Sequence, residues 1–236
     1  MQNSLQMIDN KQENDYSSNA SAERAAVTEG RILDAAEVVF ARRGLAGTRV
    51  REIAAAVGLN GATLYNYYPS KDALYEAVLE RGIQPLSTLL SDFAVASNES
   101  ESAHQIVRAV MQHLAERPHL SKLIYLEAIS QGDFLPKLAR RWVRPLLEQI
   151  VGQLKARPTP VHFDEGLFVH VATLFIQLSF GHFALAPLLD EAMDEDPTSV
   201  EGVERQTRLI ETVIEQLFPR LVQSAGQGEG KSEEEV

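Results

Sequence analysis

The chain has 236 residues, no cysteine and a formal net charge of −11. The absence of cysteine excludes disulfides, thiolate metal ligands and a cysteine nucleophile, and no apolar run reaches the roughly 18 residues that a membrane span needs. The polar N-terminus lacks the pattern of a secretory signal, so the sequence predicts a cytoplasmic protein.

The two ends of the chain differ in composition from the part between them. Residues 1–22 are rich in Asn, Gln, Ser and Asp, and residues 223–236 are rich in Gly and Glu, so both are expected to be disordered. The sequence between them has helical periodicity and contains no convincing strand. The predicted fold is therefore all-α.

The first two helices after the arm are short, and each ends at a glycine. The first ends at Gly44, and its apolar stripe consists of Ile32, Leu33, Ala36, Val39 and Phe40. The second follows Thr48, whose hydroxyl is expected to cap it, and ends at Gly58, which can adopt the left-handed conformation. Its apolar residues recur at helical spacing: Val50, Ile53, Ala54 and Val57.

A third helix, Gly61 to Tyr67, has only two turns. Asn60 is its predicted N-cap, and Pro69 ends it. Ser70 is expected to cap the next helix, with Lys71 in its first turn. A helix N-terminus beside an ammonium group is suited to binding phosphate.

Each of these signals occurs in many helical domains, but their combination is typical of a helix-turn-helix. Residues 32–80 resemble the N-terminal domain of the TetR family of bacterial transcriptional regulators. The matching segments are Ile32 to Ala36, Phe40 with Gly44, Val50 to Ala54, Val57 to Leu59, Thr63 to Tyr68 and Ser70 to Leu74. Residues 60–62 are less basic than the Ser-Lys-Gly often found there. The resemblance implies a homodimer, a palindromic double-stranded DNA operator and a C-terminal helical domain that binds a small-molecule effector.

The candidate DNA contacts divide into two groups. Those expected at phosphates are Thr48, Arg49, Tyr67 and Lys71, and those expected at base edges are Ala62, Thr63, Tyr65 and Asn66, with Asn60 and Gly61 completing the set. Residues 24–82 carry a net charge of +1, whereas residues 83–236 carry −9. The overall acidity therefore does not oppose DNA binding at this block, because local charge governs phosphate contact.

The rest of the chain is expected to form a second helical domain. The predicted domains are a disordered arm (1–22), a helix-turn-helix domain (23–82), a ligand-binding and dimerisation domain (83–222) and a disordered tail (223–236). The predicted helices cover about 71–81, 84–97, 102–116, 119–131, 134–156, 163–189 and 199–222. Breaks are expected at Gly82, at Asn98 to Glu101, at Arg157 to Pro160 and over Asp190 to Pro197, and Pro145 should kink or split its helix.

The segment from Glu165 to Leu189 has almost no polar face. A helix that is apolar all round must be buried on every side, so one side is expected to meet a partner subunit. With the last helix, it would form a four-helix dimer interface. The alternative is a central core helix of a monomer.

The predicted effector pocket combines aromatic bulk with polar tips. Its candidates are Phe93, His113, Tyr125, Glu127, Phe134, Trp142, His170, Phe175, Gln177 and His182. Each has an alternative explanation as an ordinary core or surface residue, and for Glu127 this alternative is an ion pair with a nearby arginine such as Arg140 or Arg144. The histidines and acids show no metal-ligand spacing, and no cofactor is expected.

The sequence thus favours a ligand-responsive transcriptional regulator, with repression as the expected mode and activation left open. One alternative is a DNA-binding protein of the same fold that a protein partner controls. An enzyme is disfavoured, since the sequence contains no Gly-x-Ser-x-Gly, His-Glu-x-x-His, Walker loop or Gly-x-Gly-x-x-Gly.

Overall fold

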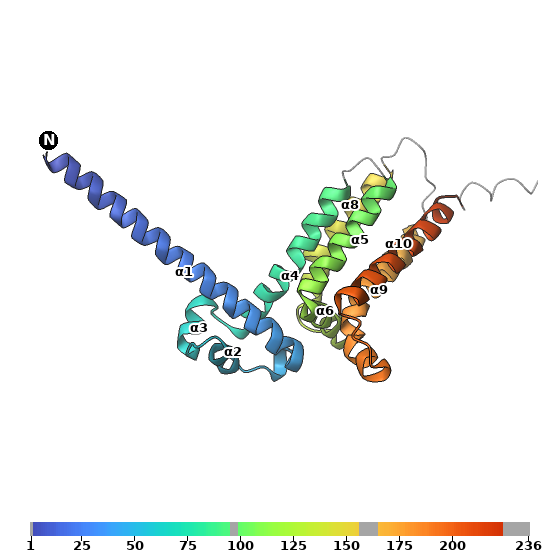
Figure 1. Ribbon diagram of the computed structural model, residues 1–236, viewed down its shortest axis with the longest axis horizontal. Helices are drawn as coiled ribbons and strands as arrows, with labels where there is room; N and C mark the ends of the chain where they lie inside the picture. The colour runs from blue at the N-terminus through green and yellow to red at the C-terminus, as the bar shows by residue number, and fades with distance from the viewer. Residues whose placement is uncertain (1, 95–98, 156–164, 224–236) are drawn as a thin grey trace, which may run out of the picture. The chain divides into compact units, whose positions relative to one another are not determined.

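A computed structural model describes residues 2–94, 99–155 and 165–223 of the chain (Figure 1). All regular elements within these ranges are helical, which confirms the predicted all-α fold. The chain divides into two compact units, Met1–Val78 and Leu79–Val236. The predicted domain boundary after residue 82 falls in the same helix as this division, α4 (Lys71–Ala94).

The N-terminal unit contains α1 (Gln2–Gly47), α2 (Val50–Ala56), α3 (Gly61–Tyr67) and the start of α4. The sequence predicts a disordered arm over residues 1–22, whereas the structure continues α1 back to Gln2. Extending an existing helix adds a hydrogen bond per residue without a new nucleation step. A prediction from composition alone does not include this effect of the neighbouring helix. At the other end, Gly44 has a φ of 67°, so the regular helix ends where the sequence predicts.

The core of this unit is built from the predicted apolar stripes. Ile32, Phe40, Ile53 and Leu64 are at most 1% exposed. The ring of Phe40 meets the edge of Tyr75 from α4 at a centroid distance of 4.9 Å, a favourable aromatic geometry. These contacts fix α2 and α3 against α1 and α4.

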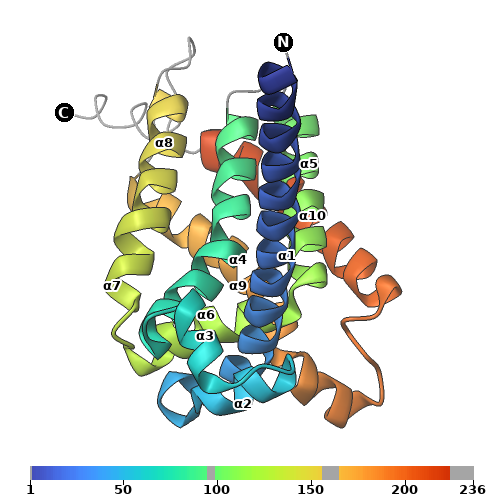
Figure 2. The same ribbon diagram turned by 90° about the vertical axis from the view of Figure 1, so that its left-hand side faces the viewer.

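The C-terminal unit contains the rest of α4 and seven further elements. They are α5 (Glu99–Glu116), α6 (Pro118–Ser130), α7 (Leu135–Leu138), a π-helical turn η1 (Ala139–Val143), α8 (Arg144–Lys155), α9 (Glu165–Met193) and α10 (Val200–Gln223). Helices α5, α9 and α10 pack on one another, and α6 packs on α9 (Figures 1 and 2).

The predicted break at Gly82 is wrong, because α4 runs through it. A Cβ at this position would overlap the buried side chain of Leu120 on α6. Gly82 therefore allows two helices to approach closely rather than ending one of them. Pro85, three residues later, also lies inside α4, although it has no backbone N–H to donate.

The predicted helix 134–156 is split, as Pro145 led us to expect. The π-helical turn η1 lies just before this proline, which cannot donate a helical hydrogen bond.

Gly181 stays inside α9, where a Cβ would come to 3.1 Å from the Tyr125 hydroxyl. The predicted break at Arg157 to Pro160 lies outside the described residues, as does Asn98 of the earlier one.

Helix α9 is longer than predicted, since it continues to Met193 through Pro187. It includes one stretch, Val169–Met193, that is long and apolar enough to cross a membrane by length and composition, contrary to the prediction from the sequence that no such run exists. The core helix of a soluble protein can have the same length and composition. Much of this stretch is exposed in the single chain, so its predicted burial on every side is not achieved within one subunit.

Candidate nucleic-acid interface

The first turn of α3 is fixed by the side chain that the sequence assigns to its cap. Asn60 Oδ1 accepts a hydrogen bond from the backbone N–H of Thr63 at 2.8 Å and one from the Thr63 hydroxyl at 3.0 Å. The cap prediction is confirmed. The Thr63 hydroxyl hydrogen is committed to this bond, so its methyl group and oxygen lone pairs remain to contact a ligand.

The turn between α2 and α3 is held from both sides. Gly58 has a φ of 74°, the left-handed conformation predicted for it. From α1, the Arg31 guanidinium donates to the carbonyl oxygen of Val57 at 3.2 Å. This bond satisfies a carbonyl at the C-terminus of α2, and sequence reasoning missed it because Arg31 lies 26 residues away.

Thr48 does not cap α2, contrary to the sequence prediction. The N-cap residue is Arg49, which has no side-chain cap bond. The Thr48 hydroxyl instead donates to the carbonyl oxygen of Gly44 at 2.7 Å, and the residue is 3% exposed. Because Gly44 adopts the left-handed conformation, its carbonyl oxygen is available to the Thr48 hydroxyl. The resulting hydrogen bond closes the turn between α1 and α2.

Lys71 is also engaged within the unit. Its Nζ donates to the carbonyl oxygen of Leu45 at 2.7 Å and to that of Thr48 at 3.3 Å. The ammonium therefore ties the start of α4 to the turn before α2. Ser70 caps α4 as predicted, since its hydroxyl accepts the backbone N–H of Ala73 at 3.0 Å.

The exposed side chains of this region are mainly basic residues and the outer face of α3. On α3, Ala62, Tyr65 and Asn66 are exposed, and Tyr67 is half-buried. Arg42, Arg49 and Arg51 are exposed as well. Arg43 pairs with Glu52 across α1 and α2 at 2.9 Å, so its charge is partly neutralised. The face combines cationic groups with a short helix whose polar side chains point away from the core.

Leu64 and Tyr68 hold α3 to the unit from its inner side. Leu64 is 1% exposed, as predicted. The Tyr68 hydroxyl donates to Glu29 Oε1 of α1 at 2.9 Å. No local pattern predicts this bond, because its partners are 39 residues apart.

Three of the predicted effector residues have identified contacts inside the C-terminal unit. His113 Nε2 lies 2.8 Å from the carbonyl oxygen of Gly82, so this nitrogen carries the proton and links α5 to α4. Tyr125 is half-buried beside Gly181, and burial raises the pKa of its hydroxyl. His182 binds the carbonyl oxygen of Pro197 at 2.8 Å.

Three further candidates are buried near the turn that links α6 to η1. Glu127 is 5% exposed, and a Cβ on Gly132 would overlap its carboxylate. Phe134 is 7% exposed, with the Lys137 ammonium 5.3 Å from its ring centroid. Trp142 is 8% exposed beneath the Arg141 guanidinium. The pairing of Glu127 with Arg140 or Arg144 stays a prediction.

The remaining candidates lie on α4 and α9. His170 and Gln177 are exposed on α9, on the side that carries Val169 and Ile176, while Phe175 is half-buried. The side chain of Phe93 lies outside the described residues. In the described ranges, no group of three or more His, Asp or Glu residues is placed to bind a metal ion.

Comparison with known sequences identifies the N-terminal region. A family described as "Bacterial regulatory proteins, tetR family" matches residues 32–78. The HTH-type transcriptional regulator RutR of Escherichia coli K12 is 30% identical over 129 residues, 53% of this chain and 54% of that protein. The HTH-type transcriptional repressor SCO4008 of Streptomyces coelicolor is 34% identical over 115 residues, 48% of this chain and 57% of that protein. The chain thus spans about half the length of these relatives.

Comparison with solved structures extends the likeness to the whole fold. The fatty acid degradation regulator FadR of Bacillus halodurans has a TM-score of 0.56 at 18% identity, over 77% of this chain and 93% of that one. A TetR-like transcriptional regulator of Rhodococcus sp. RHA1 has a TM-score of 0.55 at 21% identity, over 82% and 97%. At these identities the likeness shows the fold alone: an N-terminal helix-turn-helix domain followed by a helical domain.

Proposed function

Because the chain belongs, through its N-terminal domain, to the TetR family of bacterial regulatory proteins, we propose that it is a cytoplasmic transcriptional repressor. It binds a palindromic DNA operator as a homodimer and is released by a small molecule. The observation that carries this proposal is the capped helix α3, which presents Ala62, Tyr65 and Asn66 outward beside exposed arginines.

The two groups of predicted DNA contacts have different support. Tyr65 and Asn66 offer hydrogen-bonding groups at an exposed helix face, as base readout in a major groove requires. Arg49 is exposed and suits a phosphate. Thr48 and Lys71 are bound to backbone carbonyls, so we assign them the indirect role of holding the turn that carries Arg49.

We place the homodimer interface on α9, with α10 beside it. Val169, Thr173 and Ile176 form an exposed stripe at helical spacing on α9, and Val169 and Ile176 are 57% and 40% exposed. On α10, Leu209 is 51% exposed. Association of two copies would remove this apolar surface from water, and two-fold symmetry matches a palindromic operator. His170 and Gln177 then belong to the interface rather than to a pocket.

The effector site belongs to the C-terminal unit in this proposal. Buried Glu127, Phe134 and Trp142, with half-buried Tyr125, supply aromatic surface and polar groups there, the composition expected of a small-molecule site. The effector acts by linkage: it binds one conformation of the dimer more tightly and so changes the affinity for DNA.

Selection of genomic DNA fragments by the purified chain, followed by footprinting, tests the proposal. A protected palindrome of about two helical turns is expected, since each subunit reads one major groove. Candidate effectors are then tested for release of this DNA. Sequence-independent protection alone would refute operator recognition, and specific binding that only a protein partner relieves would favour control by that partner.

A further inference from the structure

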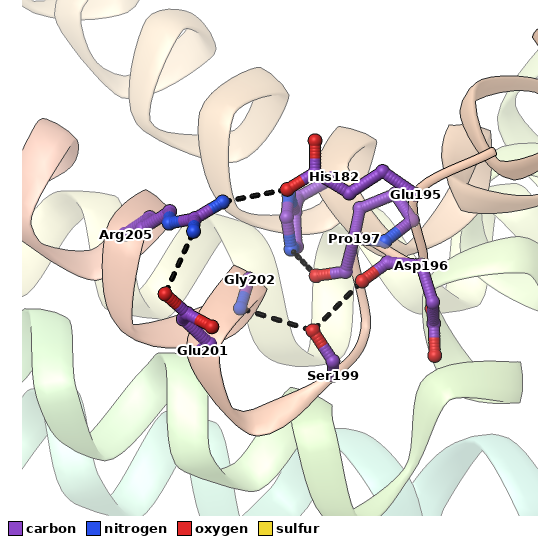
Figure 3. A network of polar contacts seen from close by, with 8 residues as sticks. All are labelled: His182, Glu195, Asp196, Pro197, Ser199, Glu201, Gly202 and Arg205. Atoms are coloured by element: carbon purple, nitrogen blue, oxygen red, sulfur yellow. Dashed lines mark hydrogen bonds and ion pairs between the residues drawn. The ribbon is translucent and has the colours of Figure 1, made fainter. Parts of the chain in front are cut away.

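The connection between α9 and α10 is a closed polar network (Figure 3). His182 of α9 reaches across to bind the carbonyl oxygen of Pro197 at 2.8 Å. The Asp196 carboxylate accepts the backbone N–H of Thr198 at 2.8 Å and its hydroxyl at 2.7 Å. Asp194 opens the turn in the left-handed conformation, with a φ of 54°. The turn is therefore defined by several bonds at once.

The start of α10 is bound into the same network. The Ser199 hydroxyl donates to the carbonyl oxygen of Asp196 at 2.8 Å and accepts the backbone N–H of Gly202 at 3.1 Å. A Cβ on Gly202 would overlap the carbonyl oxygen of Pro197, so the helix and the turn touch backbone to backbone. Arg205 pairs with both Glu195 and Glu201 (Figure 3). The connection is pre-organised, since its cost in conformational entropy is met on folding.

This rigid connection presents an apolar surface to solvent. The exposed fractions are 52% for Leu185, 65% for Leu188, 38% for Leu189, 67% for Met193 and 81% for Val200. We call these five residues the knob. Single exposed leucines are ordinary, but five large apolar residues around one rigid turn mark an interaction surface.

Acidic residues surround the knob. Asp190, Glu191, Asp194, Glu195 and Asp196 are all exposed, and Arg205 partly neutralises Glu195. A partner that covers the knob must therefore bring positive charge to its edge, because like charges brought together at an interface are unfavourable.

The C-terminal unit itself carries a surface of this kind. Lys137, Arg140 and Arg144 are exposed and follow one another at helical spacing over α7, η1 and the start of α8. We call these three residues the ridge. Arg141, between them, is bound to Glu80 of α4, which anchors the segment. At the end of α6 that leads into α7, Ile129 is 78% exposed.

The knob and the ridge lie on different sides of the unit, α7 on one and the α9–α10 connection on the other (Figure 2). They can therefore meet only between two molecules. We propose that the knob of one copy docks on the ridge of a second copy, with the acidic residues facing Lys137, Arg140 and Arg144. In a two-fold dimer the contact occurs twice.

Charge singles out a second copy as the occupant. The acidic residues around the knob carry the charge opposite to that of the ridge. This inference rests on the proposed homodimer, to which it adds a separate electrostatic contact. It also assigns the basic segment a role other than binding DNA.

Charge reversal and charge swap in the full-length chain test the contact. The variants are D190K/E191K on the knob side, R140E/R144E on the ridge, and all four changes together. The dimer dissociation constant is measured by sedimentation at about 0.1 M and about 1 M salt, where the Debye lengths are about 10 Å and 3 Å. Ile176→Asp is measured in parallel as a variant of the α9 stripe, and melting curves check that each variant folds.

Each double reversal is expected to weaken the dimer at least roughly tenfold at low salt, because two symmetric contacts each lose two charge pairs. The four-fold swap should restore most of the affinity, and high salt should reduce all the differences. Unchanged dissociation constants, or a swap variant no tighter than the double reversals, would overturn the contact even where Ile176→Asp splits the dimer. A wild-type chain that stays monomeric would overturn both the contact and the proposed homodimer.

Discussion

Lys71 is the residue for which sequence and structure make opposite predictions. The sequence places its ammonium on a DNA phosphate, whereas the structure places it on the carbonyl oxygens of Leu45 and Thr48 at 2.7 and 3.3 Å. Lys71→Met keeps the apolar stem and removes the charge. Arg49→Met is the matched control, because Arg49 is exposed on the same turn.

The expected loss of unfolding free energy in Lys71→Met follows from the two hydrogen bonds to carbonyl oxygens. A hydrogen bond from a charged donor contributes about 1.5–3 kcal/mol. Lys71 is partly exposed, however, so in the variant water can bind the two carbonyl oxygens in place of the ammonium. We therefore expect Lys71→Met to lower the unfolding free energy of the N-terminal unit by about 1–2 kcal/mol. Arg49→Met should change it by less than about 0.5 kcal/mol, as surface substitutions usually do.

Denaturant unfolding and DNA titration together check this reasoning. Unfolding is followed by circular dichroism, and operator affinity is measured over a range of salt. Arg49→Met should reduce the slope of log affinity against log salt by about 0.9, the value for one phosphate contact on duplex DNA. Lys71→Met should weaken binding with a smaller change in slope, because the substitution loosens the turn that carries Arg49 but removes no contact with a phosphate.

The reverse pattern would refute the structural assignment. If Lys71→Met left stability unchanged and lowered the slope by a full contact, the ammonium would be acting on phosphate, as the sequence predicts. If both variants behaved alike in unfolding and in salt dependence, the distinction between the two residues would be wrong.

Three further predictions concern separate parts of the chain. Gly202→Ala should lower stability by roughly 1–3 kcal/mol through overlap with a backbone carbonyl, whereas Gly152→Ala, at an open helical position, should stabilise by about 0.4–1 kcal/mol; thermal melts compare the two. Burial holds the pKa of His182 below its ordinary 6.5, despite the opposing effects of the Pro197 carbonyl and Asp196. As pH falls, the unfolded chain therefore takes up this proton at a higher pH than the folded chain does. The stability from neutral His182 is thus complete above pH 6.5 and is lost as pH falls through the folded value; unfolding measured against pH should show this dependence reduced in His182→Gln. Asn66→Ala should change which operator sequences are preferred, at about 1–3 kcal/mol for the affected base pair, and a uniform loss across sequences in a binding selection would exclude base readout.

The local elements of the N-terminal unit were predictable because their signals are short-range. Asn60 acts on an N–H three residues away, and Gly58 meets a conformational need of its own backbone. The failure at Thr48 was equally local: a hydroxyl before a helix can bond forward to an N–H or backward to a carbonyl, and the left-handed Gly44 made the backward bond available. Sequence alone does not rank these two bonds.

The sequence by itself determined the helical class, the pair of short helices with the Asn60 cap on the second, and the apolar character of α9, since periodicity and caps depend on residues within a few turns. Tertiary structure alone decided what Arg31, Lys71 and Gly82 do. Arg31 and Lys71 bind carbonyls more than 20 residues away, and Gly82 makes room for Leu120 where a break was expected. A charged side chain or a glycine has the same local signature whether it faces solvent, DNA or another helix. Its role is decided by which distant backbone or side chain the fold brings within reach.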